Sequence, residues 1–114
     1  MEVVSRPPRR DEVWLVSLDP TRGTEIKKTR PCLIVSPDEM NEHLQTAIVA
    51  PMTTTLRHYP TRVALTFRGK SGQVAPDQLR AVDHERLVRK LGTIPSKTAG
   101  LVSAVLVEIF GRES

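Results

Sequence analysis

The sequence predicts a mainly β protein: a small, strongly bent antiparallel sheet or barrel, closed by one amphipathic helix at its C-terminus. Nine prolines lie scattered through the 114 residues, which leaves few stretches long enough for an uninterrupted helix. Several short segments are apolar or alternate between apolar and polar residues, as strands do. A chain of this length forms one domain with one core, so large α/β architectures are excluded.

The first expected strand covers residues 13–18, where Trp14, Val16 and Leu18 alternate with residues that face the other way, so Trp14 should lie in the core. Pro31 can stand at the beginning of a strand but not in its middle, which places a second strand at 30–36. Further strands are expected at 46–50 and 62–68. Shorter candidates are 73–75, 78–82 and 87–91, the last of which is ambiguous with helix.

Two helices are expected. Ser36, Pro37 and Glu39 have the order of a capping box, which predicts a short helix ending near His43. Apolar residues that recur every four positions, as on one face of a helix, predict a terminal helix between Ser96 and residue 111. The segments between strands, 19–29 and 53–60, are polar and should be exposed loops, and 69–72 should be a turn. Residues 1–10 are expected to form a flexible basic arm, and 11–114 a single domain.

The charge balance narrows the classes of partner. Lys and Arg number 17 against 13 Asp and Glu, a net charge of +4, and the basic residues concentrate in 22–30 and 57–70. This pattern is typical of a protein with a polyanionic partner, or else of a solvated basic face. No apolar stretch resembles a signal peptide or a membrane span, so the protein is expected in the cytoplasm.

The sequence lacks the residue patterns of several common kinds of catalytic and binding site. Cys32 is the only cysteine and sits in an apolar run, which indicates a buried, inert thiol and excludes an intramolecular disulfide. The three histidines lie far apart without paired ligand spacing, so neither a metal nor a cofactor is expected. No glycine-rich nucleotide fingerprint and no serine-hydrolase elbow is present.

Six sequence blocks, in this order along the chain, together resemble the motifs of a known family. They read DEVWLV (11–16), LDPTRGTE (18–25), KTRP (28–31), APMTT (50–54), YPTRV (59–63) and DQLRAVD (77–83). With these blocks the chain closely resembles the MazF/PemK/Kid family of toxin endoribonucleases. The resemblance implies an SH3-like barrel that works as a homodimer, cuts single-stranded RNA or mRNA without a metal, and is silenced by a cognate antitoxin, here expected to be acidic.

The resemblance also implies site residues. Arg30 matches the family's catalytic arginine, and its planar guanidinium suits the phosphoryl oxygens of a charged transition state. Thr53 matches the catalytic threonine, whose hydroxyl can donate to a phosphoryl oxygen, although Thr54 could take its place. Glu25 matches an acidic position, where it would take a proton or hold Arg30. An arginine is a poor base because its pKa exceeds about 12, so the general base stays open between Glu25, Arg30 and His58.

For RNA binding, Gln78 matches a glutamine that contacts bases in related proteins. Lys27, Lys28 and Arg57 are candidates for phosphate contacts, which give affinity without sequence information. Aromatic residues make up 4% of the chain, and Tyr59 is the one in an expected loop, so a platform for stacking bases is not predicted.

The leading interpretation is a metal-independent endoribonuclease that leaves 2′,3′-cyclic phosphate and 5′-hydroxyl ends and arrests growth. Two alternatives stay open. One is a non-enzymatic toxin of the same barrel type that resembles the CcdB gyrase poisons, against which Arg30 and Thr53 argue. The other is an inert SH3-like binding module, whose function would survive loss of Arg30.

Overall fold

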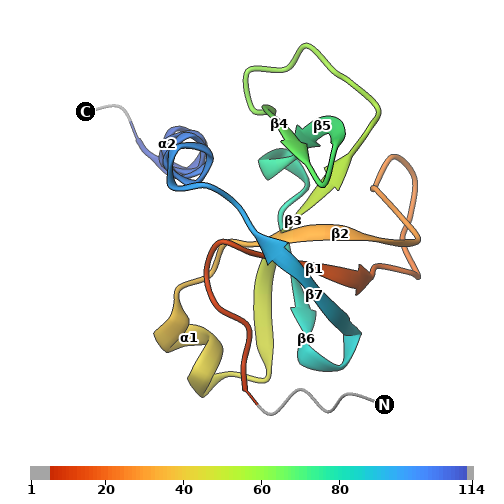
Figure 1. The fold of residues 1–114 in the computed structure, drawn as a ribbon, viewed down its shortest axis with the longest axis vertical. Helices are drawn as coiled ribbons and strands as arrows, with labels where there is room; N and C mark the ends of the chain where they lie inside the picture. Colours follow the sequence, from red (N-terminus) through yellow and green to blue (C-terminus); the bar gives the residue numbers. More distant parts are fainter. Residues whose placement is uncertain (1–5, 113–114) are drawn as a thin grey trace.

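The computed structural model describes residues 6–112, which form a curved sheet flanked by helices (Figure 1). The strands are β1 (Glu12–Ser17), β2 (Thr29–Ile34), β3 (Thr46–Thr53), β4 (Val63–Phe67), β5 (Lys70–Val74), β6 (Arg80–Asp83) and β7 (Leu87–Thr93). The α-helices are α1 (Asp38–His43) and α2 (Ser96–Phe110), and short 3₁₀ helices, η1 (Pro76–Gln78) and η2 (His84–Arg86), flank β6. The predicted mainly β class with a C-terminal helix is confirmed.

Strand β3 joins the two parts of the sheet. The strand order is β4-β5-β3-β2-β1-β7, all neighbours pair antiparallel, and β6 also pairs with β3. The first half of β3 pairs with β6, its middle with β2, and its last two residues with β5. As a result, the β4–β5 hairpin stands over the far end of β3, where β2 begins (Figure 1).

The alternation of side chains along β1, β2 and β3 builds two core clusters, one on each face of the sheet. The outer cluster lies under α2 and includes Val13, Leu33, Ala50 and Val102. The inner cluster is enclosed by the curved strands and consists of Trp14, Val16, Leu18, Cys32, Ile34, Val49, Val82 and Leu87. Trp14 is 3% exposed, as its place in the predicted first strand requires.

Local details differ from the sequence-based expectations. No capping box forms at α1: Pro37 is the N-cap, and the Ser36 hydroxyl instead donates to Asn41 and accepts from the Ile48 N–H. The turn expected at 69–72 is a two-residue turn, Arg68 and Gly69, both at positive φ, so the strand resumes at Lys70. The ambiguous segment 87–91 is strand β7. None of the helices within residues 6–112 is both long enough and apolar enough to cross a membrane.

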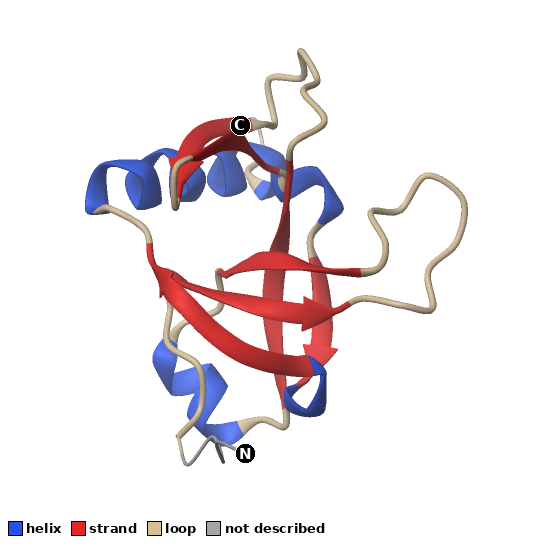
Figure 2. Cartoon of the chain, turned by 45° about the vertical axis from the view of Figure 1, so that its right-hand side comes forward, coloured by secondary structure: helices blue, strands red, loops and turns tan. Residues whose placement is uncertain are grey.

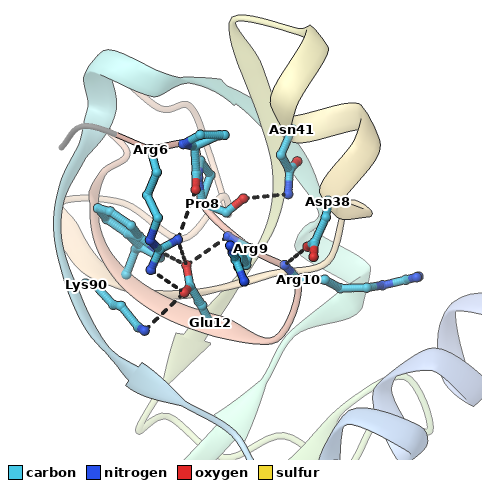
Figure 3. A network of polar contacts seen from close by, with 10 residues as sticks. Arg6, Pro8, Arg9, Arg10, Glu12, Asp38, Asn41 and Lys90 are labelled. Atoms are coloured by element: carbon cyan, nitrogen blue, oxygen red, sulfur yellow. Dashed lines mark hydrogen bonds and ion pairs between the residues drawn. The ribbon is translucent and has the colours of Figure 1, made fainter.

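The N-terminal segment is attached to the barrel by hydrogen bonds (Figure 3). The buried carboxylate of Glu12 accepts hydrogen bonds from the Arg6 guanidinium and the Arg9 N–H, and the Asn41 side chain donates to the Pro8 carbonyl. Pro8 itself is fully buried. Residues 6–10, expected as part of a flexible arm, are therefore held in place, whereas residues 1–5 of that expected arm lie outside the described residues.

Candidate active site

The pairing of β2 with β3 brings Arg30 and Thr53 to one edge of the sheet. The β2–β3 ladder ends with Cys32 opposite Pro51. Arg30 precedes Cys32 by two residues and Thr53 follows Pro51 by two, so both residues lie just beyond this last pair. The two residues line a cavity of about 330 Å³ between this edge and the β4–β5 hairpin. The cavity is lined by Lys28, Thr29, Arg30, Pro31, Met52, Thr53, Thr54, Leu65, Phe67, Lys70, Ser71, Gly72 and Gln73.

The Arg30 guanidinium is oriented by the loop that precedes β2. Its Nε donates a hydrogen bond to the Lys27 carbonyl oxygen at 2.7 Å. The guanidinium is planar, so the bond at Nε also fixes the directions of Nη1 and Nη2, which can both donate to the same anion. Arg30 is partly buried, so its charge is only partly screened by water.

The Thr53 hydroxyl is also oriented by its own chain. Its Oγ1 accepts a hydrogen bond from the Thr55 N–H at 3.1 Å, and Thr53 is only 8% exposed. Because the oxygen accepts from the backbone, the hydroxyl proton is free to donate toward a ligand. Thr54 lines the same cavity and is exposed, so both threonines of the expected pair face it.

Three cationic side chains line the cavity, from two sides. Lys28 and Arg30 approach from the start of β2, and Lys70 approaches from the opposite hairpin. Lys28 has φ +73°, a conformation that a residue with a side chain adopts at a cost, and its backbone is held there by the Asp19 carboxylate and the Leu18 N–H. The floor is apolar and formed by Met52, Leu65 and Phe67. The arrangement suits an anion beside a flat apolar group.

Strand β5 supports the end of β3 at close range. Gly72 packs against the Thr53 backbone so tightly that a Cβ at this position would lie 2.6 Å from the Thr53 carbonyl oxygen. Gln73 binds the following loop through both ends of its amide: Oε1 accepts from the Arg57 N–H and Nε2 donates to the Arg57 carbonyl. Thr53 and the loop after it are therefore positioned by residues 72 and 73.

We expect Gly72→Ala to destabilise the protein by about 1–3 kcal/mol, because the contact with Thr53 is a backbone contact that no side-chain rotation relieves. Equilibrium unfolding in urea measures the change. Gly100→Ala is the matched control: Gly100 lies in α2, and a Cβ added there would have nothing within 4 Å, so this variant should gain roughly 0.5–1 kcal/mol. Equal stabilities of the two variants would contradict the tight approach.

Glu25 and Gln78 lie beside a second cavity, of about 220 Å³, rather than in the first. The Glu25 carboxylate accepts a hydrogen bond from the Arg22 N–H within its own loop. The Gln78 amide contacts the same loop, accepting from the Ile26 N–H and donating to the Thr24 carbonyl. Of the residues implied by the resemblance, the structure brings Lys28, Arg30, Thr53 and Thr54 together, and it places Glu25 and Gln78 in the neighbouring group.

The other expected residues are exposed and line neither of these two cavities. They are Lys27, Arg57 and His58. The Arg62 guanidinium lies over one face of the Tyr59 ring, 5.1 Å from its centroid, and also pairs with Asp77, whereas Tyr59 itself is 50% exposed. Sequence reasoning missed Phe67 and Lys70, which reach the first cavity because the hairpin folds over β3. The alternation along 62–68 identified Phe67 as core-facing but carried no information on which cavity it would line.

Cys32 is the buried thiol that its apolar surroundings in the sequence predict, and it is fully buried. Burial raises its pKa to about 12, against the opposing effect of Arg80 and Arg30, so the thiol stays protonated at neutral pH. Among residues 6–112, no three His, Cys, Asp or Glu side chains gather as a metal site would require.

Curated relatives with similar sequences are bacterial endoribonucleases. The chain is 37% identical over 107 residues to the endoribonuclease PemK of Escherichia coli, covering 85% of this chain and 80% of that protein. It is 30% identical over 112 residues to the endoribonuclease toxin MazF of E. coli strain K12, covering 96% of this chain and all of the relative.

Solved structures share the fold. The crystal structure of MazF from Deinococcus radiodurans superimposes with a TM-score of 0.84 at 26% identity, covering 95% of this chain and 100% of that one. A mycobacterial endoribonuclease, solved in complex with its cognate antitoxin, has a TM-score of 0.79 at 26% identity, and the match covers 94% of this chain and 98% of that one. The family model of the PemK-like, MazF-like toxins matches residues 9–110. The chain therefore belongs to the PemK-like, MazF-like toxin family of type II toxin-antitoxin systems.

Proposed function

We propose that the chain is an endoribonuclease that cleaves single-stranded RNA at short sequences and needs no metal ion. The 2′-hydroxyl oxygen attacks the adjacent phosphorus and loses its proton, and the bond from phosphorus to the 5′-oxygen breaks. The leaving oxygen takes up a proton. The products are a 2′,3′-cyclic phosphate and a 5′-hydroxyl end, so no water enters the bond-breaking step.

The observation that carries this proposal is the cavity that Arg30 and Thr53 share. The attack places extra negative charge on the non-bridging oxygens of the phosphorus, and donors already aimed at that position stabilise the transition state without reorganising. Arg30 offers two Nη groups in one plane, while Thr53 offers a hydroxyl proton that its backbone contact leaves free. Lys28 and Lys70 attract the flanking phosphates toward this point.

The same proposal includes protein partners. The similar mycobacterial endoribonuclease was solved with its cognate antitoxin, and the net charge of +4 suits an acidic antitoxin segment. We also propose that the chain forms a homodimer, since α2 exposes the large apolar side chains of Leu101, Val107 and Phe110, and exposed apolar patches are typical of protein–protein interfaces. In the cell, uncontrolled cleavage of mRNA would arrest growth.

The test is cleavage of a long RNA by the purified protein in excess EDTA, followed by mapping and chemical typing of the new ends. We expect cuts at one short recurring sequence, with cyclic phosphate and 5′-hydroxyl termini. A matched substrate carries a single 2′-deoxynucleotide on the 5′ side of one mapped site. That site should resist cleavage, because the attacking oxygen is missing there, while the other sites are still cut.

Each alternative to the proposed reaction predicts a different outcome of this cleavage test. Cleavage that disappears in EDTA and returns with Mg²⁺ would exclude the metal-independent reaction. Cleavage at the 2′-deoxy site would exclude attack by the 2′-hydroxyl. An intact RNA together with growth arrest on expression would favour a toxin that binds a protein target instead.

A further inference from the structure

We propose that Gln78 is a positioning residue: its side-chain amide fixes the backbone of the β1–β2 loop so that the loop holds the Arg30 guanidinium in place. The loop, residues 18–28, joins β1 to β2 and projects away from the sheet (Figure 2). This inference rests on the proposed function, because it assigns to Gln78 a part in the chemistry of Arg30.

The Gln78 side chain bonds to the loop at both ends of its amide. Its Oε1 accepts a hydrogen bond from the Ile26 N–H at 3.1 Å, and its Nε2 donates to the Thr24 carbonyl at 3.4 Å. These partners lie 52 and 54 positions away in sequence, so the contact joins η1 to the loop across the fold. Ile26 also packs against the inner core cluster, which fixes its side chain.

A short path leads from this contact to Arg30. Lys27 directly follows Ile26, and the Lys27 carbonyl oxygen accepts the hydrogen bond from Arg30 Nε at 2.7 Å. The Lys27 carbonyl lies one residue beyond the held Ile26 N–H, in the peptide unit whose Lys28 N–H donates to the Asp19 carboxylate at 2.9 Å. Gln78 and Asp19 therefore restrict the backbone of Ile26 and Lys27 from its two sides, and the carbonyl that they place orients the guanidinium. The path runs through backbone atoms, so it does not depend on the Lys27 side chain.

The ends of the loop are fastened by other groups. Arg80 Nη1 donates to the Leu18 carbonyl at 3.0 Å, and Arg86 Nη1 donates to the Ser17 carbonyl at 3.1 Å. The Lys28 carbonyl accepts from the Leu18 N–H and closes the loop. With both ends held in this way, loss of the Gln78 contacts should release the middle of the loop without unfolding the sheet.

The other role considered for Gln78 is contact with RNA bases. In this structure both ends of the amide are occupied by loop backbone, and the side chain lines the second cavity rather than the one that contains Arg30 and Thr53. Each end of the amide uses one hydrogen bond on the loop, so only one N–H and one lone pair are left for a base. The geometry favours positioning, and the two roles give different kinetic results.

The first test compares Gln78→Met, which keeps the length of the side chain but removes its hydrogen bonds, with the wild type. We expect kcat to fall about 10- to 100-fold, the loss that a misplaced catalytic group produces, while KM and the cleavage sequence stay unchanged. Gln78→Glu keeps an acceptor for the Ile26 N–H and should recover part of the activity. Gln45→Met is the control, since Gln45 is exposed outside both cavities and this variant should retain full activity.

The second test is independent of catalysis. In NMR spectra of the wild type, the Arg30 Nε–H and the Ile26 amide should exchange slowly with water, and Gln78→Met should speed both exchanges at least several-fold. An altered cleavage sequence with unchanged Arg30 exchange would overturn the inference in favour of base reading. Unchanged kcat, KM and exchange would also overturn it. If the wild type does not cleave RNA, the proposed function fails, while the exchange measurement still decides whether Gln78 holds Arg30.

Discussion

Arg30→Ala is expected to reduce RNA cleavage at least 10²- to 10³-fold, the usual cost of removing a preorganised donor from a developing negative charge. The side chain supplies two Nη groups to the cavity that it shares with Thr53. Arg30→Lys keeps the charge but loses the planar fork and the geometry of the bond to the Lys27 carbonyl. We expect this variant to recover only a small part of the lost rate, measured as single-turnover cleavage of one oligonucleotide.

The control for this experiment is Arg89→Ala, because Arg89 is exposed on β7 and outside the residues that line the two cavities. It removes the same charge, so it reports how much of the loss comes from general attraction of RNA. Both variants should unfold at nearly the wild-type urea concentration. If Arg30→Ala cleaved as fast as Arg89→Ala, the assignment of transition-state stabilisation to Arg30 would be wrong.

The parts of this fold that sequence could predict are those set by local pattern. The alternation of Trp14, Val16 and Leu18 predicts β1, and the apolar residues that recur every four positions after Ser96 predict α2. Sequence motifs identified Arg30 and Thr53 as candidates, and both lie where strands begin or end. Their meeting in one cavity follows from the β2–β3 register, which a single sequence does not reveal.

Other parts depend on contacts between distant segments. The Ser36 hydroxyl caps no helix because Asn41 and the Ile48 N–H offer it buried partners. Lys70 reaches the site because a two-residue turn folds β5 back over the end of β3. Gln78 satisfies its amide on a loop 52 positions away. Ser36 and Gln78 bond to partners that only the tertiary structure provides, and Lys70 reaches the site only through strand pairing, so local sequence carries no record of these contacts.

The second large effect concerns stability and is centred on Glu12, on the side of the barrel shown in Figure 3. Glu12 is 4% exposed. Its Oε2 accepts from Arg6 at 2.8 Å and from Lys90 at 3.1 Å, and its Oε1 accepts from the Trp14 indole at 3.0 Å and the Arg9 N–H at 2.8 Å. One carboxylate thus joins the N-terminal segment, β1 and β7.

These contacts set its ionisation. Burial by itself would raise the pKa of Glu12, but the hydrogen bonds from Arg6, Arg9, Trp14 and Lys90 outweigh burial and lower the pKa from 4.5 to about 2. A pKa lowered by folding means that the carboxylate stabilises the native state above pH 4.5. That contribution is lost as the pH falls from 4.5 toward 2. The size of the shift corresponds to roughly 2–3 kcal/mol, since Arg6 and Lys90 are themselves partly exposed to water.

We therefore expect Glu12→Gln to lower the free energy of unfolding at pH 7 by roughly 2–3 kcal/mol, because the neutral amide leaves Arg6 and Lys90 without their anion. Urea unfolding across pH 2–7 measures this, with Glu42→Gln on the exposed face of α1 as control. Below pH 4.5 the wild-type curve should fall toward that of Glu12→Gln. In Glu12→Gln the free energy of unfolding should still fall with decreasing pH, in part because of Asp77. The pKa of Asp77 is also lowered: burial opposes the shift, and hydrogen bonds from Arg62 overcome it. Parallel curves for Glu12→Gln and the wild type would contradict the assignment, because the acid sensitivity would then arise from other carboxylates.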